Sequence, residues 1–125
     1  MTPENQYNLL LDSILLVASS ADEQLSSLPD FVVVTDEVAT TFGDAFLLVP
    51  QLERAGIIST DVVSALRKLD SHFNRMPDED ALMDPASLRD HPFWEEARRL
   101  ATEALAKLGE EKRPPNLSGT IWVRV

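Results

Sequence analysis

The chain contains no cysteine, which excludes disulfide bonds, thiolate catalysis and cysteine-based zinc sites. It has only four glycines, and none of them forms the GxGxxG or GxxxxGK(S/T) loops that bind phosphates. The GxSxG turn that exposes a catalytic serine is also missing. Without cysteine, a nucleophile would have to be a serine or threonine activated by one of two histidines. We therefore expect a protein without catalytic activity and without a cofactor.

Basic residues are absent from the first part of the chain. Arg54 is the first lysine or arginine, and nine acidic side chains precede it. Residues 54–125 hold the other twelve acids and all eleven bases, so nine of the ten net negative charges lie in residues 1–53. This field repels phosphate backbones, so we expect no nucleic-acid binding, and it attracts basic protein surfaces. The alternative is that the acidity serves solubility alone.

Long hydrophobic runs are also absent. The longest candidate, LLLDSILLVASSA (residues 9–21), lacks a preceding basic segment and contains Asp12, so it does not resemble an export signal. It is too short and too polar to span a bilayer. We therefore expect a buried helix in a cytoplasmic protein, with no membrane contact.

Amphipathic helices account for most of the sequence. Hydrophobic residues recur at three- and four-residue steps in four stretches. Thr2-Pro3 predicts the first helix start, and Ser20–Glu23 matches a capping box where that helix breaks and restarts. The other expected helices run from about Asp36 to Ala55 with Thr35 as N-cap, from Ser59 or Thr60 to Pro77, and from about Pro92 to Leu108.

Two segments leave the choice between helix and strand open. FVVV (residues 31–34) is β-branched enough for a short strand, although it also continues the hydrophobic stripe of the helix that follows. TIWVRV (residues 120–125) alternates in the manner of a strand. The two segments could pair, or the second could lie along the helices. We predict an all-α domain, a compact bundle of four main helices, with this short β element as an open addition. Residues 1–113 form the single domain, and residues 114–125 form a C-terminal tail or short strand.

The stretch DHPFWEEARRL (residues 90–100) is the one place that looks chemical. His91 and Glu95 are one helical turn apart, as metal ligands can be, but no HExxH, HxH or Glu-x-x-His element accompanies them. Asp90 or His91 is instead suited to cap the helix that begins at Pro92, and Trp94 is suited to its buried side. We interpret the stretch as a helix start and expect no metal site.

The pattern of two segments resembles that of a known class of small proteins. DFVVVTDEVATTFGDAFLLVPQLERAGIIS, followed by HPFWEEARRLATEALAKLG, is similar to the small, acidic, all-helical immunity proteins encoded beside bacterial secreted toxins, and to uncharacterised helical domains of that size. The similarity covers residues 30–109 and includes no diagnostic motif. It implies an inhibitor whose acidic surface covers the basic groove of a toxin that attacks nucleic acid.

These patterns predict a non-catalytic module that binds a basic protein partner. We expect the contact surface to draw on the acid-only half. Trp122 either covers the helical bundle or is available as an aromatic contact, because tryptophan is enriched in interface hot spots. The alternative is a structural or regulatory helical domain that forms a homodimer or docks on a larger protein. The candidate partner-binding residues are Asp22, Glu23, Asp36, Glu37, Asp44 and Trp122.

Overall fold

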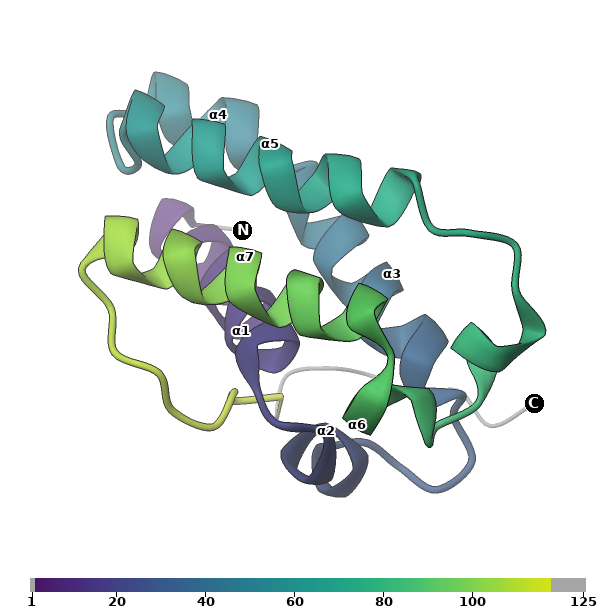
Figure 1. Ribbon diagram of the computed structural model, residues 1–125. Helices are drawn as coiled ribbons and strands as arrows, with labels where there is room; N and C mark the ends of the chain where they lie inside the picture. Colours follow the sequence, from purple (N-terminus) through teal and green to yellow (C-terminus); the bar gives the residue numbers. More distant parts are fainter. Residues whose placement is uncertain (1, 118–125) are drawn as a thin grey trace.

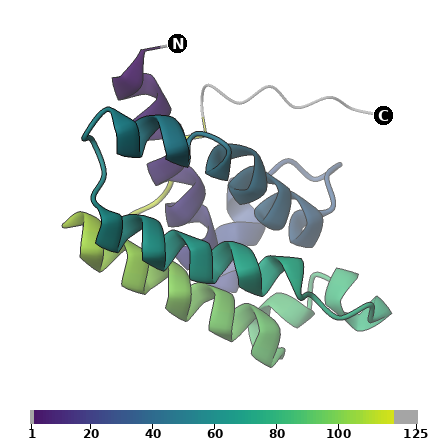
Figure 2. The ribbon, with the colours of Figure 1, turned by 90° about the horizontal axis from the view of Figure 1, so that it is seen from above.

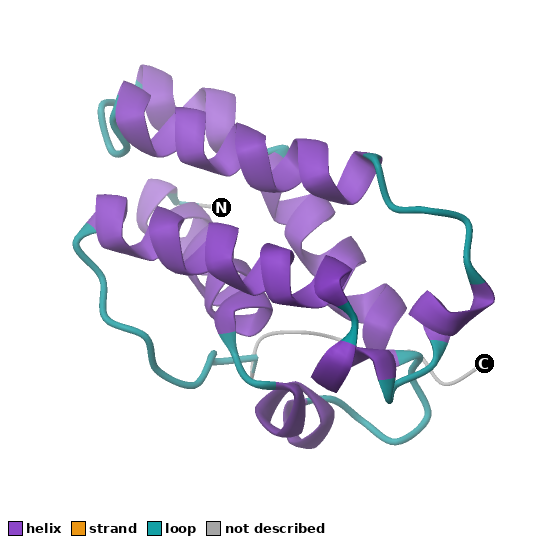
Figure 3. Cartoon of the chain, in the orientation of Figure 1, coloured by secondary structure: helices purple, strands orange, loops and turns teal. Residues whose placement is uncertain are grey.

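The computed structural model describes residues 2–117, and every regular element in that range is helical (Figures 1 and 3). The prediction of an all-α protein is therefore confirmed. The bundle of four main helices is not confirmed in that simple form, because short helical pieces separate the longer helices. The elements in order are α1 (Pro3–Ala18), α2 (Ala21–Ser27), α3 (Val34–Phe46), α4 (Val49–Arg54), α5 (Thr60–Asn74), the 3-10 helix η1 (Asp80–Met83), α6 (Ser87–Asp90) and α7 (Pro92–Leu108).

Side-chain caps fix several of the helix starts where the sequence predicted them. The Thr2 hydroxyl accepts the Asn5 N–H at 3.1 Å and begins α1. At α2 the capping box is complete, since Ser20 Oγ accepts the Glu23 N–H while the Glu23 carboxylate accepts the Ser20 N–H. Ser59 caps α5 in the same way. Such a cap contributes about 1 kcal/mol, so these residues mark the boundaries reliably.

Helix α1 is enclosed by its neighbours over its second half. From Leu10 to Ala18 every residue except Asp12 is buried, and the helix contacts α3, α4 and α7. A helix that is apolar on all sides needs such neighbours. Helices α5 and α7 run side by side in opposite directions, as Figure 2 shows from above.

An aromatic cluster joins α3, α5 and α7. The ring centroids of Phe42 and Phe73 are 5.9 Å apart, those of Phe73 and Phe93 are 6.0 Å apart, and those of Phe93 and Trp94 are 5.1 Å apart. Phe42 is fully buried and Trp94 is 2% exposed. Aromatic pairs at these distances add about 0.5–1.5 kcal/mol to the burial itself. Trp94 is therefore a core residue, as predicted.

Residues 31–34 do not form the strand that the β-branched sequence allowed. Val32 N–H closes a turn onto the Pro29 carbonyl at 3.3 Å, and the chain enters α3 directly at Val34. Thr35 is not the N-cap that the sequence predicted. It lies in the first turn, 1% exposed, and its hydroxyl donates to the Met83 carbonyl at 3.2 Å. The hydrophobic stripe of α3 outweighed the local β propensity, and Val34 is buried as the first residue of this helix.

The single helix predicted from Asp36 to Ala55 is two helices. Helix α3 ends at Phe46, and α4 begins at Val49 after two residues in a turn. Pro50 explains the break, because it has no N–H to donate to the Phe46 carbonyl. The stop after α4 is as expected, since Gly56 has a φ of 74°, which favours glycine.

The segment after α7 returns along α1. Gly109 ends α7 in the left-handed conformation, so the helix stops at Leu108 as predicted. The Tyr7 hydroxyl then donates to Glu110 at 2.9 Å, and Asp12 Oδ1 accepts the Asn116 N–H at 3.0 Å. Residues 114–117 contain no regular structure. The strand expected at residues 120–125 lies outside the described residues.

Candidate functional site

One face of α3 carries acidic side chains between two exposed hydrophobic residues. Val33, Glu37, Asp44 and Leu47 are separated by steps of three, four or seven residues, which place them on one side of a helix. Asp36 lies beside Glu37 on the same turn. Val33 is 52% exposed and Leu47 is 74% exposed. We call these five residues the α3 face.

The opposite side of α3 fixes the orientation of this face. Val34, Val38, Phe42 and Ala45 are buried against the core, and Phe42 is inaccessible to solvent. Rotating the helix would expose these side chains, at about 1.5–3 kcal/mol for each large one. The acidic residues are therefore held on the outside by the packing of their neighbours.

The acidic side chains of the α3 face are not neutralised by basic residues in the described part of the chain. Within residues 2–117, no ion pair involves Asp36, Glu37 or Asp44. Partial burial raises the pKa of the Glu37 carboxyl, and the negative charges of Asp36 and Asp44 raise it further. The structure thus brings three of the predicted partner-binding residues together, and their negative charges repel one another.

The other predicted acids already have partners within the chain. Asp22 lies on α2, and its carboxylate is 2.6 Å from Nη2 of Arg89. Glu23 is part of the capping box, and its hydrogen bonds with Ser20 lower the pKa of its carboxyl. Contact of Asp22 or Glu23 with a partner remains a prediction. Trp122, the remaining predicted contact, lies outside the described residues.

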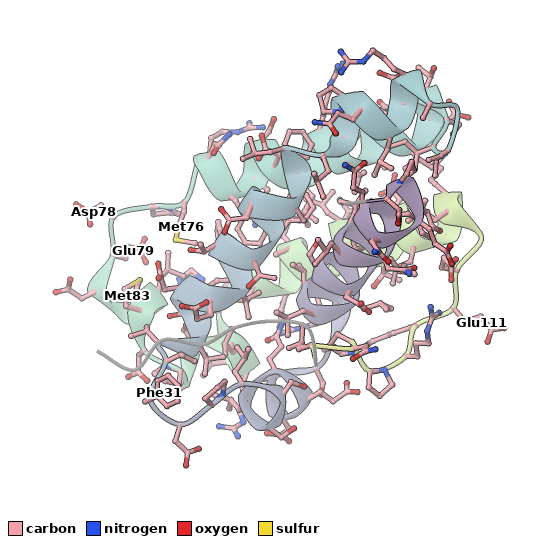
Figure 4. All side chains as sticks on the ribbon, turned by 180° about the vertical axis from the view of Figure 1, so that it is seen from behind. Phe31, Met76, Asp78, Glu79, Met83 and Glu111 are labelled. Carbon is pink, nitrogen blue, oxygen red and sulfur yellow. The ribbon has the colours of Figure 1, made fainter. Side chains whose placement is uncertain are left out.

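Sequence reasoning missed two exposed hydrophobic residues near the start of α3. Phe31 is 40% exposed and Met83 is 45% exposed. The hydrogen bond from Thr35 to the Met83 carbonyl holds η1 beside the first turn of α3. Figure 4 shows Phe31, Met83 and Glu79 at one end of the molecule. The sequence leaves Phe31 open between a short strand and the hydrophobic stripe of the following helix, and a single methionine in an acidic connection has no periodic pattern, so neither exposure could be predicted from the sequence.

The histidines have structural roles in the described part of the chain. His91 is the N-cap of α7, because its Nδ1 accepts the Phe93 N–H at 3.0 Å, while its Nε2 lies 3.3 Å from Glu79. The His72 ring stacks on Phe93 with a centroid distance of 4.2 Å. The helix-start interpretation of residues 90–100 is thus confirmed. No three His, Asp or Glu side chains converge as metal ligands between residues 2 and 117.

No family model, curated protein or solved structure matches the chain. Among the described residues, no helix is long and apolar enough to cross a membrane. The function therefore has to be inferred from the geometry and charge of this surface.

Proposed function

We propose that the protein is a non-catalytic binding module whose α3 face contacts a basic protein partner. The observation that carries the proposal is the grouping of Asp36, Glu37 and Asp44 on one exposed helical face, with no base among the described residues to neutralise them. Charges arranged in this way cost folding stability, since they repel one another. A cationic surface placed against them would remove that cost.

The hydrophobic residues at the two ends of this face add to the proposal. Protein interfaces commonly combine a buried centre of apolar or aromatic contacts with a polar rim. Val33 and Leu47 are exposed at the two ends of α3, and Met83 is exposed beside its start. In this arrangement the acids would steer association, and the hydrophobic residues would slow dissociation.

A nucleic-acid-attacking toxin is the partner class that fits this surface best. Such an enzyme needs a basic groove to bind phosphate backbones, and an acidic helix can occupy that groove. The similarity of the sequence pattern to small helical immunity proteins points to the same class. The protein would then act as an inhibitor that neutralises the toxin.

A pull-down from a lysate of the source cells, at low and moderate salt, tests the proposal. We expect one basic protein to be recovered at low salt and lost as salt rises, because exposed charges are screened. The double variant Asp36→Asn, Asp44→Asn should weaken its capture. The matched control is Asp61→Asn with Glu111→Gln, which removes two exposed acids elsewhere; Glu111 lies at the other end of the molecule in Figure 4. Equal capture by both double variants, or capture independent of salt, would refute the proposal.

Self-association is the alternative, and the exposure of two hydrophobic residues outside the α3 face, Leu9 and Ile57, favours it. Two α3 faces in contact would bring six carboxylates close together. A dimer would therefore have to form through another surface, or form only at high salt, where the charges are screened. Sedimentation equilibrium separates the two functions. A dimer that strengthens with salt supports self-association, whereas a monomer at all salt concentrations supports the binding module.

A further inference from the structure

A small cleft between α2, α6 and α7 has a charge opposite to that of the rest of the molecule. Its volume is about 290 Å³, and its lining includes Arg89, Arg98 and Lys112, with Asp22 as the one acid. Three of the eleven bases of a chain with a net charge of −10 therefore converge on one depression. Helices α2 and α6 are in contact, and Figure 1 shows them side by side at one end of the molecule.

Arg98 is the central cation of this cleft. Its Nε donates to the Ser19 carbonyl at 3.0 Å, and its Nη2 donates to the Leu88 carbonyl. These neutral acceptors fix the guanidinium in place without cancelling its charge. Partial burial lowers the Arg98 pKa, and the nearby charge of Glu95 offsets this only in part. No carboxylate among the described residues lies within 4.0 Å of Arg98.

The two other cations differ in their partners. Arg89 forms an ion pair with Asp22, so the pair contributes little net charge. Lys112 forms no ion pair in the described chain, and the Glu23 carboxylate, held by the Ser20 cap, acts on it only from a distance. Arg98 and Lys112 therefore form no ion pair among the described residues, although the more distant charges of Glu95 and Glu23 act on them. The Ser20 hydroxyl also lines it, and its hydrogen is free for donation because its oxygen is the acceptor in the cap.

We propose that this cleft binds a phosphate group, either as free phosphate or as the monoester of a small molecule. A phosphate monoester carries a charge of about −1.5 to −2 at neutral pH, which matches two cations without an ion-pair partner better than a carboxylate does. Guanidinium groups bind such oxyanions through directed N–H donors, and a lysine adds a mobile point charge. This site is separate from the α3 face and does not depend on the function proposed for that face.

Nuclear magnetic resonance titration with inorganic phosphate, at neutral pH and constant ionic strength, tests the proposal. We expect saturable amide shifts confined to residues 20–22, 88–89 and 112. Lys112→Gln should weaken binding about two- to fivefold, the range of a solvent-exposed ion pair. Asp22→Asn should tighten it by a similar factor, because Arg89 loses its competing carboxylate. Neither substitution removes a buried contact, so both variants should fold.

Lys107→Gln is the matched control, because Lys107 is exposed on α7 and lies outside the cleft. It should leave phosphate affinity unchanged. Titration with methyl phosphate distinguishes the two sources of the ligand, since tighter binding than inorganic phosphate indicates a monoester and weaker binding indicates free phosphate. The proposal is overturned if the shifts do not saturate, if sodium chloride reproduces them, or if Lys107→Gln and Lys112→Gln weaken binding equally.

Discussion

Tyr7 ties the segment after α7 to α1 through one hydrogen bond. Its hydroxyl donates to Glu110 at 2.9 Å, and burial together with this carboxylate raises the pKa of Tyr7 to about 12. The phenol must stay protonated to donate, so the stability it contributes is present below pH 10. That stability is lost as the pH rises through 12.

Tyr7→Phe should therefore destabilise the protein at neutral pH by about 1 kcal/mol, the usual net value of a hydrogen bond. The difference between wild type and variant should shrink as the pH rises from 10 to 12. Urea unfolding at several pH values measures this difference. Because Tyr7 is the one tyrosine in the chain, tyrosinate absorbance gives its pKa directly. A pKa near 10 in the folded protein, or a difference independent of pH, would contradict the assignment.

At the scale of elements, Gln24 holds the corner between α1 and α2. Its side chain is 1% exposed, and its amide Nε2 donates to the Leu16 and Val17 carbonyls at 3.0 and 3.2 Å. Both carbonyls lie in the last turn of α1, where the regular helical donor is missing, and the Leu16 carbonyl also accepts the Ser19 N–H at 3.3 Å. Its Oε1 has no hydrogen-bond partner among the described residues. The corner thus gains two hydrogen bonds and carries one unsatisfied acceptor.

Substitutions at Gln24 should separate these two effects. Gln24→Met keeps the volume, loses both hydrogen bonds and removes the unsatisfied oxygen, so we expect a loss of about 1–2 kcal/mol. Gln24→Glu places a buried carboxylate against two carbonyls and should cost about 3 kcal/mol or more at neutral pH. Denaturant unfolding measures both changes. Equal losses for the two variants would show that the amide donor, and not the charge, decides stability at this corner.

The elements that sequence reasoning predicted well are those with a local cause. Thr2, Ser20 and Ser59 begin helices through their own side chains, and Gly109 ends one through its own backbone. The two helix boundaries that were predicted wrongly have other causes: one depends on a residue far away in the sequence, and the other on a local signal that was overlooked. Thr35 looks like an N-cap in sequence, but its hydroxyl bonds to Met83, which is 48 residues away. The break between α3 and α4 has a local cause in Pro50, but the hydrophobic stripe continues across it and favoured a single helix.

At the scale of the molecule, the sequence predicts the net charge of each half of the chain, but not which charged side chains lie together in the folded structure. The sequence placed nine unbalanced acids in residues 1–53, and the structure divides the candidates among them into two kinds. Asp36 and Asp44 face outward on α3 without bases, whereas Asp22 pairs with Arg89, which is 67 residues away. No helical spacing could reveal that pair. The cationic cleft was equally hidden, because its three bases come from two helices and the segment that follows α7.

The acidic half of the molecule should make its stability depend on pH through Glu37. Burial, then Asp36 and Asp44, raise the pKa of this carboxyl above its ordinary value. A carboxyl with a raised folded pKa costs stability when it is charged. That cost is fully present above the folded pKa and disappears as the pH falls below the unfolded pKa of about 4.5.

Glu37→Gln should therefore stabilise the free protein at neutral pH, by up to about 0.5 kcal/mol, as is usual for surface changes. The gain should vanish as the pH is lowered through 4.5, the ordinary pKa of glutamate. Salt should remove only part of it, since burial is the larger cause and is not screened. Glu111→Gln, which changes the same charge at an exposed position, is the control for thermal unfolding. If salt abolishes the gain completely, repulsion along α3, and not burial, sets the cost of the charged Glu37 carboxylate. If Glu111→Gln stabilises the protein by the same amount, the net charge alone is responsible.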